Sequence, residues 1–228
     1  MPEYNPKKRM RKFNKMCKRC TGTLVDKLGE DKTEDIISQA RKEYELIIPE
    51  IPFIGTKTSQ LRLYLLISAE CLAFFKAMEK KGIPANESKK IMYSAAENII
   101  ESLPIPGSIA RFFGRMTYTK LYRKVLRSEA KAQDRLPKEI NWPFTVLDKG
   151  VDKDGTAFDY GFDYRGCAIK KFYERMGAGE YTDFMCSLDW PVSRLMAMGL
   201  RRKERLTNGD KRCSFRYIKG SGEEDNPL

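Results

Sequence analysis

The side chains best able to do chemistry lie in the last third of a 228-residue chain that contains no histidine. Three cysteines and one aspartate stand there as Cys167, Cys186, Asp189 and Cys213. Histidine is the commonest general base and the commonest metal ligand in proteins, so its absence restricts both kinds of site. Any chemistry must therefore use thiolate, carboxylate, lysine, arginine or tyrosine groups.

The pattern around these residues places three of them near one another. Alternation along residues 213–217 puts Cys213 on the inward face of a strand, beside two aromatic residues. Cys186 and Asp189 are three residues apart in a stretch with helical spacing, so we expect them to share a helix face. The sequence therefore predicts that Cys186, Asp189 and Cys213 line one pocket, with Cys167 in a more structural position.

The elements that must hold these residues differ between the two halves of the chain. Apolar spacing of three and four residues, with start and stop signals, predicts helices over about 7–28, 33–48, 59–81, 86–103 and 108–134. After Pro137, alternating stretches around the turn at 152–155 predict a hairpin over 144–164. Asn208-Gly209 predicts a second hairpin over 200–218. Between the hairpins, helical spacing returns over about 167–176 and 181–198.

These elements together predict an α+β fold. We expect a helical N-terminal half, residues 1–136, packed on a mostly antiparallel four-stranded sheet in residues 137–219, with helices inserted between the two hairpins. The two parts are expected to form one compact unit. The composition of residues 220–228, rich in glycine and charge, predicts a disordered tail.

The charge of the chain is concentrated at its beginning. The apolar fraction of 41% and the charged fraction of 32% are those of a globular protein. Of the net charge of +12, residues 1–21 supply +7, because they hold eight basic residues and one acidic residue. This segment could bind nucleic acid or another anionic surface. Its basic residues are not interleaved with aromatic ones, however, so a solvated helix face is favoured and nucleic acid is not expected as a partner.

The cysteine content and the absence of a secretory signal predict a cytoplasmic protein with reduced thiols. The most apolar stretch, residues 61–78, is interrupted by charged residues and predicts a buried helix rather than a membrane span. Cys17 and Cys20 lie on the apolar stripe of an amphipathic helix, so we interpret them as core residues rather than half of a zinc site. The oligomeric state is not predicted by the sequence, and a homo-oligomer is possible.

Three interpretations of the cysteine–aspartate set stay open. A thiol could attack a substrate if a positive charge from Arg202 or Lys170 lowered its pKa, and Asp189 could bind a cationic group and pass a proton. The three cysteines with Asp189 could instead hold zinc or another divalent metal, although their spacing matches no compact zinc motif. The third interpretation is that the cysteines are inert core residues.

Four short motifs carry a resemblance to a known family. They are Phe162-Asp-Tyr-Arg-Gly-Cys167, Cys186-x-x-Asp189, Gly199-Leu-x-Arg202 and Gly209-Asp-x-x-Cys213-x-Phe215. Together with the helix around residues 69–76, they resemble the signature of the L-2-amino-thiazoline-4-carboxylic acid hydrolase family over residues 45–219. The resemblance implies a hydrolase that acts on a carbon–nitrogen bond of a small cyclic amidine and gives a carbamoyl-cysteine product. The cofactor stays unknown: this interpretation requires none, and zinc or another divalent metal is possible.

The resemblance and the residue chemistry together name the candidate site. Its catalytic candidates are Cys186, Asp189 and Cys213, and its substrate-binding candidates are Arg202, Cys167 and Trp190. Arg202 could hold a substrate carboxylate in a two-pronged hydrogen bond. Trp190 directly follows Asp189 and could form a wall of the pocket.

Two positions depart from the family pattern. Ser214 stands where the family usually has an aspartate, and Arg205 stands where it usually has a threonine. Alternation places Ser214 on the strand face opposite Cys213, away from the predicted pocket. The alternative function is a non-catalytic module that binds a small ligand or a partner on the same fold.

Overall fold

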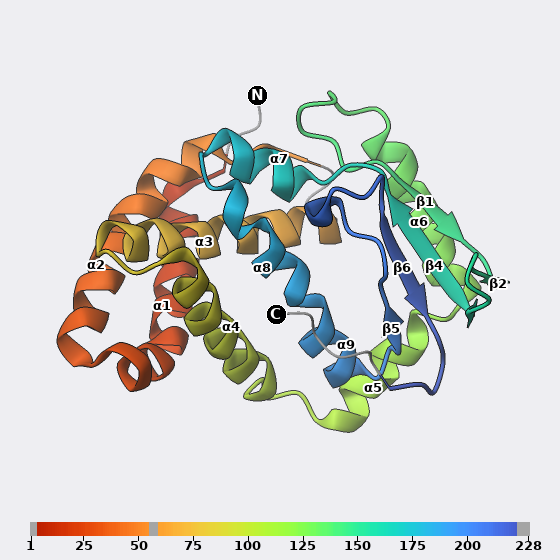
Figure 1. The fold of residues 1–228 in the computed structure, drawn as a ribbon, viewed down its shortest axis with the longest axis horizontal. Helices are drawn as coiled ribbons and strands as arrows, with labels where there is room; N and C mark the ends of the chain where they lie inside the picture. Colours follow the sequence, from red (N-terminus) through yellow and green to blue (C-terminus); the bar gives the residue numbers. More distant parts are fainter. Residues whose placement is uncertain (1–3, 55–58, 223–228) are drawn as a thin grey trace. The chain divides into compact units, whose positions relative to one another are not determined.

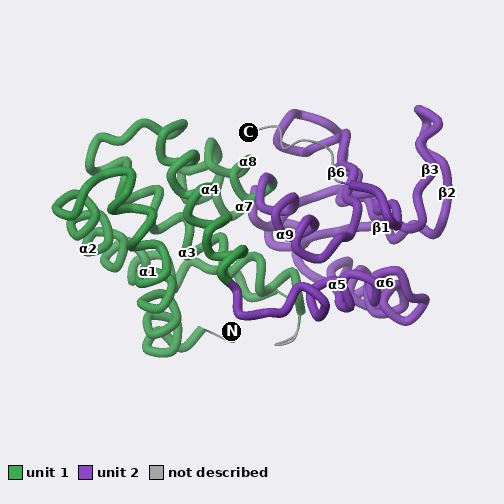
Figure 2. The backbone as a smooth tube through the Cα atoms, turned by 90° about the horizontal axis from the view of Figure 1, so that it is seen from below, with its two compact units in different colours: residues 1–102, 171–186 green, residues 103–170, 187–228 purple. Residues whose placement is uncertain are grey.

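The computed structural model describes residues 4–54 and 59–222. By its internal contacts the chain forms two compact units, coloured separately in Figure 2. The first unit contains residues up to 102 together with 171–186, and the second contains residues 103–170 and 187–228. The predicted division of the chain into residues 1–136 and 137–219 rests on the change of sequence pattern after Pro137, and it stays a prediction.

The first unit is helical (Figure 1). Its elements are α1 (Pro6–Leu28), α2 (Glu30–Ile47), the 3₁₀ turn η1 (Ile48–Glu50), α3 (Gln60–Lys80), α4 (Ala85–Glu101), the 3₁₀ turn η2 (Gly179–Tyr181) and most of α7 (Ala168–Arg175) and α8 (Thr182–Ser187). Side-chain caps fix the starts of two of them: Asn5 accepts a hydrogen bond from Lys8 N–H, and Ser59 accepts one from Arg62 N–H. Helix α3 packs against α2 and α4, and α1 packs against the same two helices.

A buried polar cluster ties three helices of the first unit together. The guanidinium of Arg9 on α1 donates to the hydroxyl of Tyr44 on α2, at 2.9 and 3.0 Å, and to the carboxylate of Glu70 on α3. Burial raises the pKa of Glu70, and the neighbouring Arg9 lowers it. A charged group is tolerated inside a core when its partner is buried with it, as here.

The cysteines of α1 are core residues, as the sequence predicted. Cys17 and Cys20 are both buried. Burial raises the pKa of Cys17 to about 11 and that of Cys20 to about 12, so both are protonated thiols at neutral pH.

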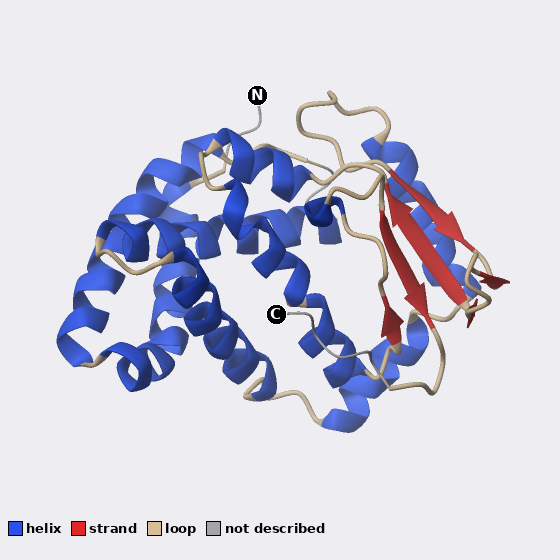
Figure 3. Ribbon diagram, viewed as in Figure 1, coloured by secondary structure: helices blue, strands red, loops and turns tan. Residues whose placement is uncertain are grey.

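The second unit contains the sheet (Figure 3). Its elements are α5 (Gly107–Met116), α6 (Lys120–Gln133), β1 (Phe144–Leu147), β2 (Gly150–Val151), β3 (Ala157–Phe158), β4 (Tyr160–Tyr164), α9 (Asp189–Met196), β5 (Leu200–Arg201), the 3₁₀ turn η3 (Leu206–Asn208) and β6 (Cys213–Tyr217). Four strands pair in the order β1-β4-β6-β5, and every pairing is antiparallel. The α+β fold and the antiparallel four-stranded sheet are thus confirmed, with helices lying in the chain between the two predicted hairpin regions.

Strand register separates the sheet residues into two faces. One face is aromatic: Phe162 stacks on Phe215 across the β4–β6 pair, and Tyr160 stacks on Tyr217. Cys213 stands opposite Tyr164 in the same register, so it belongs to this face, as alternation predicted. Helix α6 packs against β1 on the aromatic side, where Tyr122 contacts Tyr160. Figure 1 shows this helix lying along the sheet.

Two stretches predicted as single helices are divided. The stretch 108–134 separates into α5 and α6, because the Thr119 hydroxyl accepts a hydrogen bond from Tyr122 N–H and starts a new helix. The stretch 181–198 separates into α8 and α9 at Leu188. Pro191 has no N–H to donate to the carbonyl of Ser187, and its ring crowds that carbonyl, which accounts for the break. Cys186 and Asp189 therefore stand on different helices, and the prediction of a shared helix face was wrong.

The second hairpin is shorter than its sequence predicted. Strand β5 covers two residues, and Asn208-Gly209 closes the turn η3 rather than a two-residue hairpin loop. The reason lies in competing hydrogen bonds: the Asp210 carboxylate accepts from Arg205 N–H at 2.7 Å, and Cys213 Sγ accepts from Leu206 N–H. The loop therefore closes through side chains instead of a strand ladder.

Two further predictions concern the chain as a whole. Within residues 4–54 and 59–222, the structure contains no helix long and apolar enough to cross a membrane. The disordered tail predicted at 220–228 falls, from residue 223 on, outside the described residues.

Close packing of α5 on α9 gives a first testable prediction. A Cβ added at Gly114 would lie 1.8 Å from the backbone oxygen of Met196, and a backbone oxygen cannot move aside cheaply. Although alanine normally favours a helix, we expect Gly114→Ala to lower the free energy of unfolding by about 1 to 3 kcal/mol. The matched control is Gly107→Ala, whose added Cβ would meet only the flexible Arg111 side chain. Urea denaturation of both variants is the measurement, and equal stabilities would contradict the close packing.

Candidate active site

The centre of the candidate site is a buried arginine held from three sides. The Arg202 guanidinium lies 4.3 Å from the ring centre of Trp190 and 4.8 Å from that of Phe215. Its Nη1 donates a hydrogen bond to Oδ2 of Asp189. The Arg202 side chain is 1% exposed, so its positive charge is satisfied inside the protein by this carboxylate and by the two ring faces.

The segment before Arg202 fixes where that side chain enters. Gly199 has φ of +64°, and a Cβ there would lie 2.1 Å from the backbone oxygen of Ile218. The Gly199 carbonyl accepts a hydrogen bond from Ile218 N–H, and Leu200 then pairs with Tyr217. Only glycine fits this conformation and this close approach. The glycine of the Gly-Leu-x-Arg motif therefore sets the register that brings Arg202 over the aromatic face.

Asp189 is the part of this cluster that solvent can reach. Its side chain is 39% exposed, while the arginine that holds it is almost fully covered. The protein atoms around its inner side partly remove water from the carboxylate. This desolvation raises the pKa of Asp189, and Arg202 lowers it by a smaller amount, so the pKa lies above its ordinary value. A carboxylate with a raised pKa takes up a proton more readily than an ordinary aspartate, which suits a group that exchanges protons with a ligand.

Cys213 lies beside this pair on the aromatic face of β6. Burial raises the pKa of the Cys213 thiol, while a hydrogen bond from Leu206 N–H at 3.2 Å and the charge of Arg202 lower it. The net shift is upward, so the thiol is protonated at neutral pH and is a weak nucleophile in this state. Arg205, one of the two departures from the family pattern, also lowers the pKa of Cys213.

Trp190 contributes a polar atom as well as a ring face. Its Nε1 is buried, and among the residues that the structure describes it has no hydrogen-bond partner. A buried N–H left unsatisfied costs about 1 to 3 kcal/mol, so a ligand acceptor that reached this atom would be favoured.

The other two predicted cysteines lie on or next to other helices. Cys167 precedes α7, and its Sγ accepts a hydrogen bond from Lys170 N–H at 3.5 Å, as a helix-capping side chain does. This contact holds Cys167 at the start of α7, and its role at the site stays a prediction. Cys186 is half-buried on α8, in the first unit, whereas Asp189, Trp190, Arg202 and Cys213 all belong to the second.

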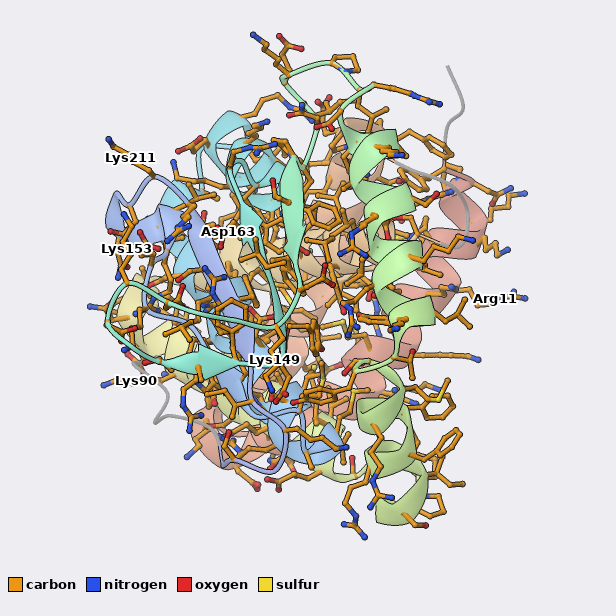
Figure 4. All side chains as sticks on the ribbon, turned by 90° about the vertical axis from the view of Figure 1, so that its right-hand side faces the viewer. Arg11, Lys90, Lys149, Lys153, Asp163 and Lys211 are labelled. Carbon is orange, nitrogen blue, oxygen red and sulfur yellow. The ribbon has the colours of Figure 1, made fainter. Side chains whose placement is uncertain are left out.

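The opposite face of the sheet carries ion pairs instead of aromatic rings. Asp163 on β4 accepts hydrogen bonds from Arg212 at 2.5 Å and from Arg216 at 2.7 Å, and Arg216 also pairs with Asp152. In Figure 4 Asp163 lies among packed side chains, whereas Lys211 extends outward at the margin. Ser214 stands directly across from Asp163, and its hydroxyl accepts a hydrogen bond from Glu204 N–H.

The position of Ser214 bears on the missing family aspartate. Because Ser214 lies on the ion-pair face, this departure removes no group from the cluster of Asp189, Arg202 and Cys213 on the other face.

The donor atoms for a metal are also not brought together. Within residues 4–54 and 59–222, no group of three or more cysteine, aspartate or glutamate side chains is placed so that it could hold a metal ion. The geometry therefore does not fit the zinc interpretation.

Sequence reasoning missed two parts of this arrangement. It did not assign Phe215 to Arg202, and it did not find Asp163 as the centre of the ion pairs. Both could have been found from alternation: Phe215 shares a face with Cys213, and Asp163 shares a face with Ser214. What alternation could not give is the path of residues 202–205, which leave the sheet.

The second unit thus brings together a carboxylate from α9, a guanidinium that follows β5 and a thiol from β6. A family model described as L-2-amino-thiazoline-4-carboxylic acid hydrolase matches residues 64–217. The chain belongs to this family, which confirms the resemblance carried by its motifs. No curated protein and no solved structure matched the chain.

The pairing of Asp189 with Arg202 gives the second prediction. Asp189→Asn would leave a buried guanidinium without its carboxylate and should lower the free energy of unfolding by about 1 to 3 kcal/mol, less than for a fully buried pair because Asp189 is part-exposed. The double variant Asp189→Asn/Arg202→Met should recover part of that loss. Asp35→Asn, which breaks the exposed Lys81–Asp35 pair, is the control and should change stability by no more than about 0.5 kcal/mol. Additive losses in the double-mutant cycle would show that the two side chains are not coupled.

Proposed function

We propose that the protein hydrolyses a small cyclic amidine related to L-2-amino-thiazoline-4-carboxylate, at the cluster formed by Asp189, Arg202 and Cys213. The single observation that carries the proposal is the half-exposed Asp189 carboxylate, held by a buried arginine in a member of this family. An amidinium is planar and cationic with two N–H groups, so a fixed carboxylate is its natural partner.

The reaction needs one water and two proton transfers. Water adds to the amidine carbon between sulfur and nitrogen, and one of its protons passes to the Asp189 carboxylate as general base. The tetrahedral carbon then breaks its bond to the ring nitrogen or the ring sulfur, and the protonated Asp189 gives its proton to that leaving atom. As that bond breaks, the water oxygen loses its second proton to solvent and becomes the carbonyl oxygen of a carbamoyl-cysteine. The raised pKa of Asp189 supports both transfers.

Arg202 fits the role of a positioning residue in this scheme. Its guanidinium is covered and already bound to Asp189, so we assign it the orientation of that carboxylate rather than the grip on a substrate carboxylate. Trp190 is buried as well, so we assign its ring to the wall of the site.

The roles of the thiols are set by their protonation. Cys213, whose pKa is raised, could donate a proton or contact the ring sulfur more easily than it could attack as a thiolate. Cys186 is the remaining candidate for covalent attack. Cys167 is proposed only as a neighbour that shapes the site.

The third prediction is the activity itself. Purified protein incubated with L-2-amino-thiazoline-4-carboxylate should release carbamoyl-cysteine, identified by mass spectrometry. A free thiol on the product would show that the carbon–sulfur bond broke, and a free amine would show that the carbon–nitrogen bond broke. Asp189→Asn should lower kcat/KM by at least about 100-fold, because it removes the general base. Wild-type protein that binds the thiazoline by calorimetry but releases no product would support the non-catalytic binding module instead.

Cys186→Ser decides between water and thiol attack. If water is activated by Asp189, this variant should keep kcat/KM within about tenfold of the wild-type value. A loss as large as that of Asp189→Asn, with a covalent adduct on Cys186 detected in the wild-type protein, would make Cys186 the nucleophile. Cys167→Ser is the matched control thiol.

The fourth prediction is a pH profile. Since Asp189 must be ionised to accept a proton, kcat/KM should fall as the pH drops through its pKa, which lies above the ordinary aspartate value of about 3.9. Arg202→Gln removes a charge that lowers this pKa, so the acid limb should move to higher pH, and Arg202→Lys should move it back. A limb that stays in place in both variants would contradict the positioning role of Arg202.

A further inference from the structure

Helix α5 is built with its small residues inward and its large apolar residues outward. Ala110 and Gly114 are buried where the helix packs on α9, and a Cβ at Gly114 would collide with the backbone of Met196. Phe112 and Phe113, by contrast, are 57% and 56% exposed. Core packing therefore accounts for the small residues of α5 and leaves its phenylalanines unexplained.

The outward apolar residues form a defined group, which we call the α5 patch. It consists of Ile109, Phe112, Phe113 and Met116, all of them exposed. The rings of Phe112 and Phe113 lie 5.9 Å apart between centres, edge to face. On α6, Leu121 and Val125 are four residues apart, share one side of that helix and are also exposed. Exposed apolar residues grouped in this way indicate an interaction surface rather than random exposure.

Basic residues accompany the α5 patch. Between residues 105 and 134 there are seven basic and two acidic residues, a net charge of +5, and two of the arginines on α6 pair with Asp148 outside this range. At 100° per residue, Arg111 and Arg115 lie together on a side of α5 that is separate both from the buried residues and from the patch. On α6, Lys124 and Lys131 are exposed. The two helices thus combine exposed aromatic and aliphatic side chains with flanking cations.

This combination of exposed apolar and basic side chains argues against a second copy of the chain as the partner of this surface. In a two-fold symmetric dimer through this surface, the same patch would face itself and bring two strongly basic segments together. An anionic lipid surface has the opposite properties: its phosphates attract the lysines and arginines, and its headgroup region accepts phenylalanine and leucine side chains. We propose that α5 and α6 dock the protein on an anionic membrane surface, lying on it without crossing it.

The experiment uses the full chain and lipid vesicles. Binding is measured by flotation with vesicles of phosphatidylcholine alone and with vesicles that also contain phosphatidylglycerol. We expect binding only to the anionic vesicles, and weaker binding as NaCl rises from about 0.1 M to about 0.5 M, since salt screens the cations. Phe112→Ser/Phe113→Ser should weaken binding at least about tenfold.

Two controls keep this test decisive. Leu46→Ser replaces an equally exposed apolar residue on α2 and should bind vesicles as the wild type does. Thermal unfolding should be unchanged in the double phenylalanine variant, because its altered side chains point to solvent. Lys7→Gln/Lys8→Gln/Lys12→Gln, on the other basic helix, should also leave vesicle binding unchanged.

Several results would overturn the proposal. These are no binding to anionic vesicles at low salt, equal binding by the double phenylalanine variant, and loss of binding only in the α1 variant. A dimer in sedimentation analysis that Phe112→Ser/Phe113→Ser dissolves would show instead that a second copy covers the α5 patch.

Discussion

The second unit is organised around the need to keep one guanidinium inside the protein. A buried arginine is stable only if its charge is matched and its flat faces are covered, and Arg202 has Asp189 for the first and two aromatic rings for the second. These partners come from α9 and β6, so the ion pair and the stacking fix a helix against the sheet. The same contacts leave the carboxylate, and not the guanidinium, open to a ligand.

The two faces of the sheet carry polar groups with different roles. The aromatic face holds Cys213 near the Asp189–Arg202 pair, while the other face neutralises Asp163 with two arginines. Period-two alternation means that adjacent residues in β6 serve different faces. The change to Ser214 therefore alters the ion-pair face and leaves the proposed reaction centre intact.

Sequence periodicity was sufficient for the fold class, the sheet and the helix positions, because each depends on local spacing of apolar residues. It correctly placed Cys213 and Ser214 on opposite faces of β6. It failed at Pro191, where one missing N–H divides a helix and separates Cys186 from Asp189. It also could not foresee that Arg202 would be covered and Asp189 exposed. The path of residues 202–205 depends on particular hydrogen bonds from the backbone N–H groups of Glu204 and Arg205 to the side chains of Ser214 and Asp210, and apolar spacing does not report such bonds.

The first unit is assembled from two separate stretches of chain, and this has a consequence for biosynthesis. Phe75, on α3, stacks on Tyr181 at 4.3 Å and meets Phe184 edge to face at 4.9 Å. On the ribosome, α1 to α4 emerge well before these two partners, while most of the second unit's first stretch is still being translated. During that interval Phe75 lacks these two aromatic contacts. The nascent helices therefore expose apolar surface that a chaperone can bind until residue 184 has emerged.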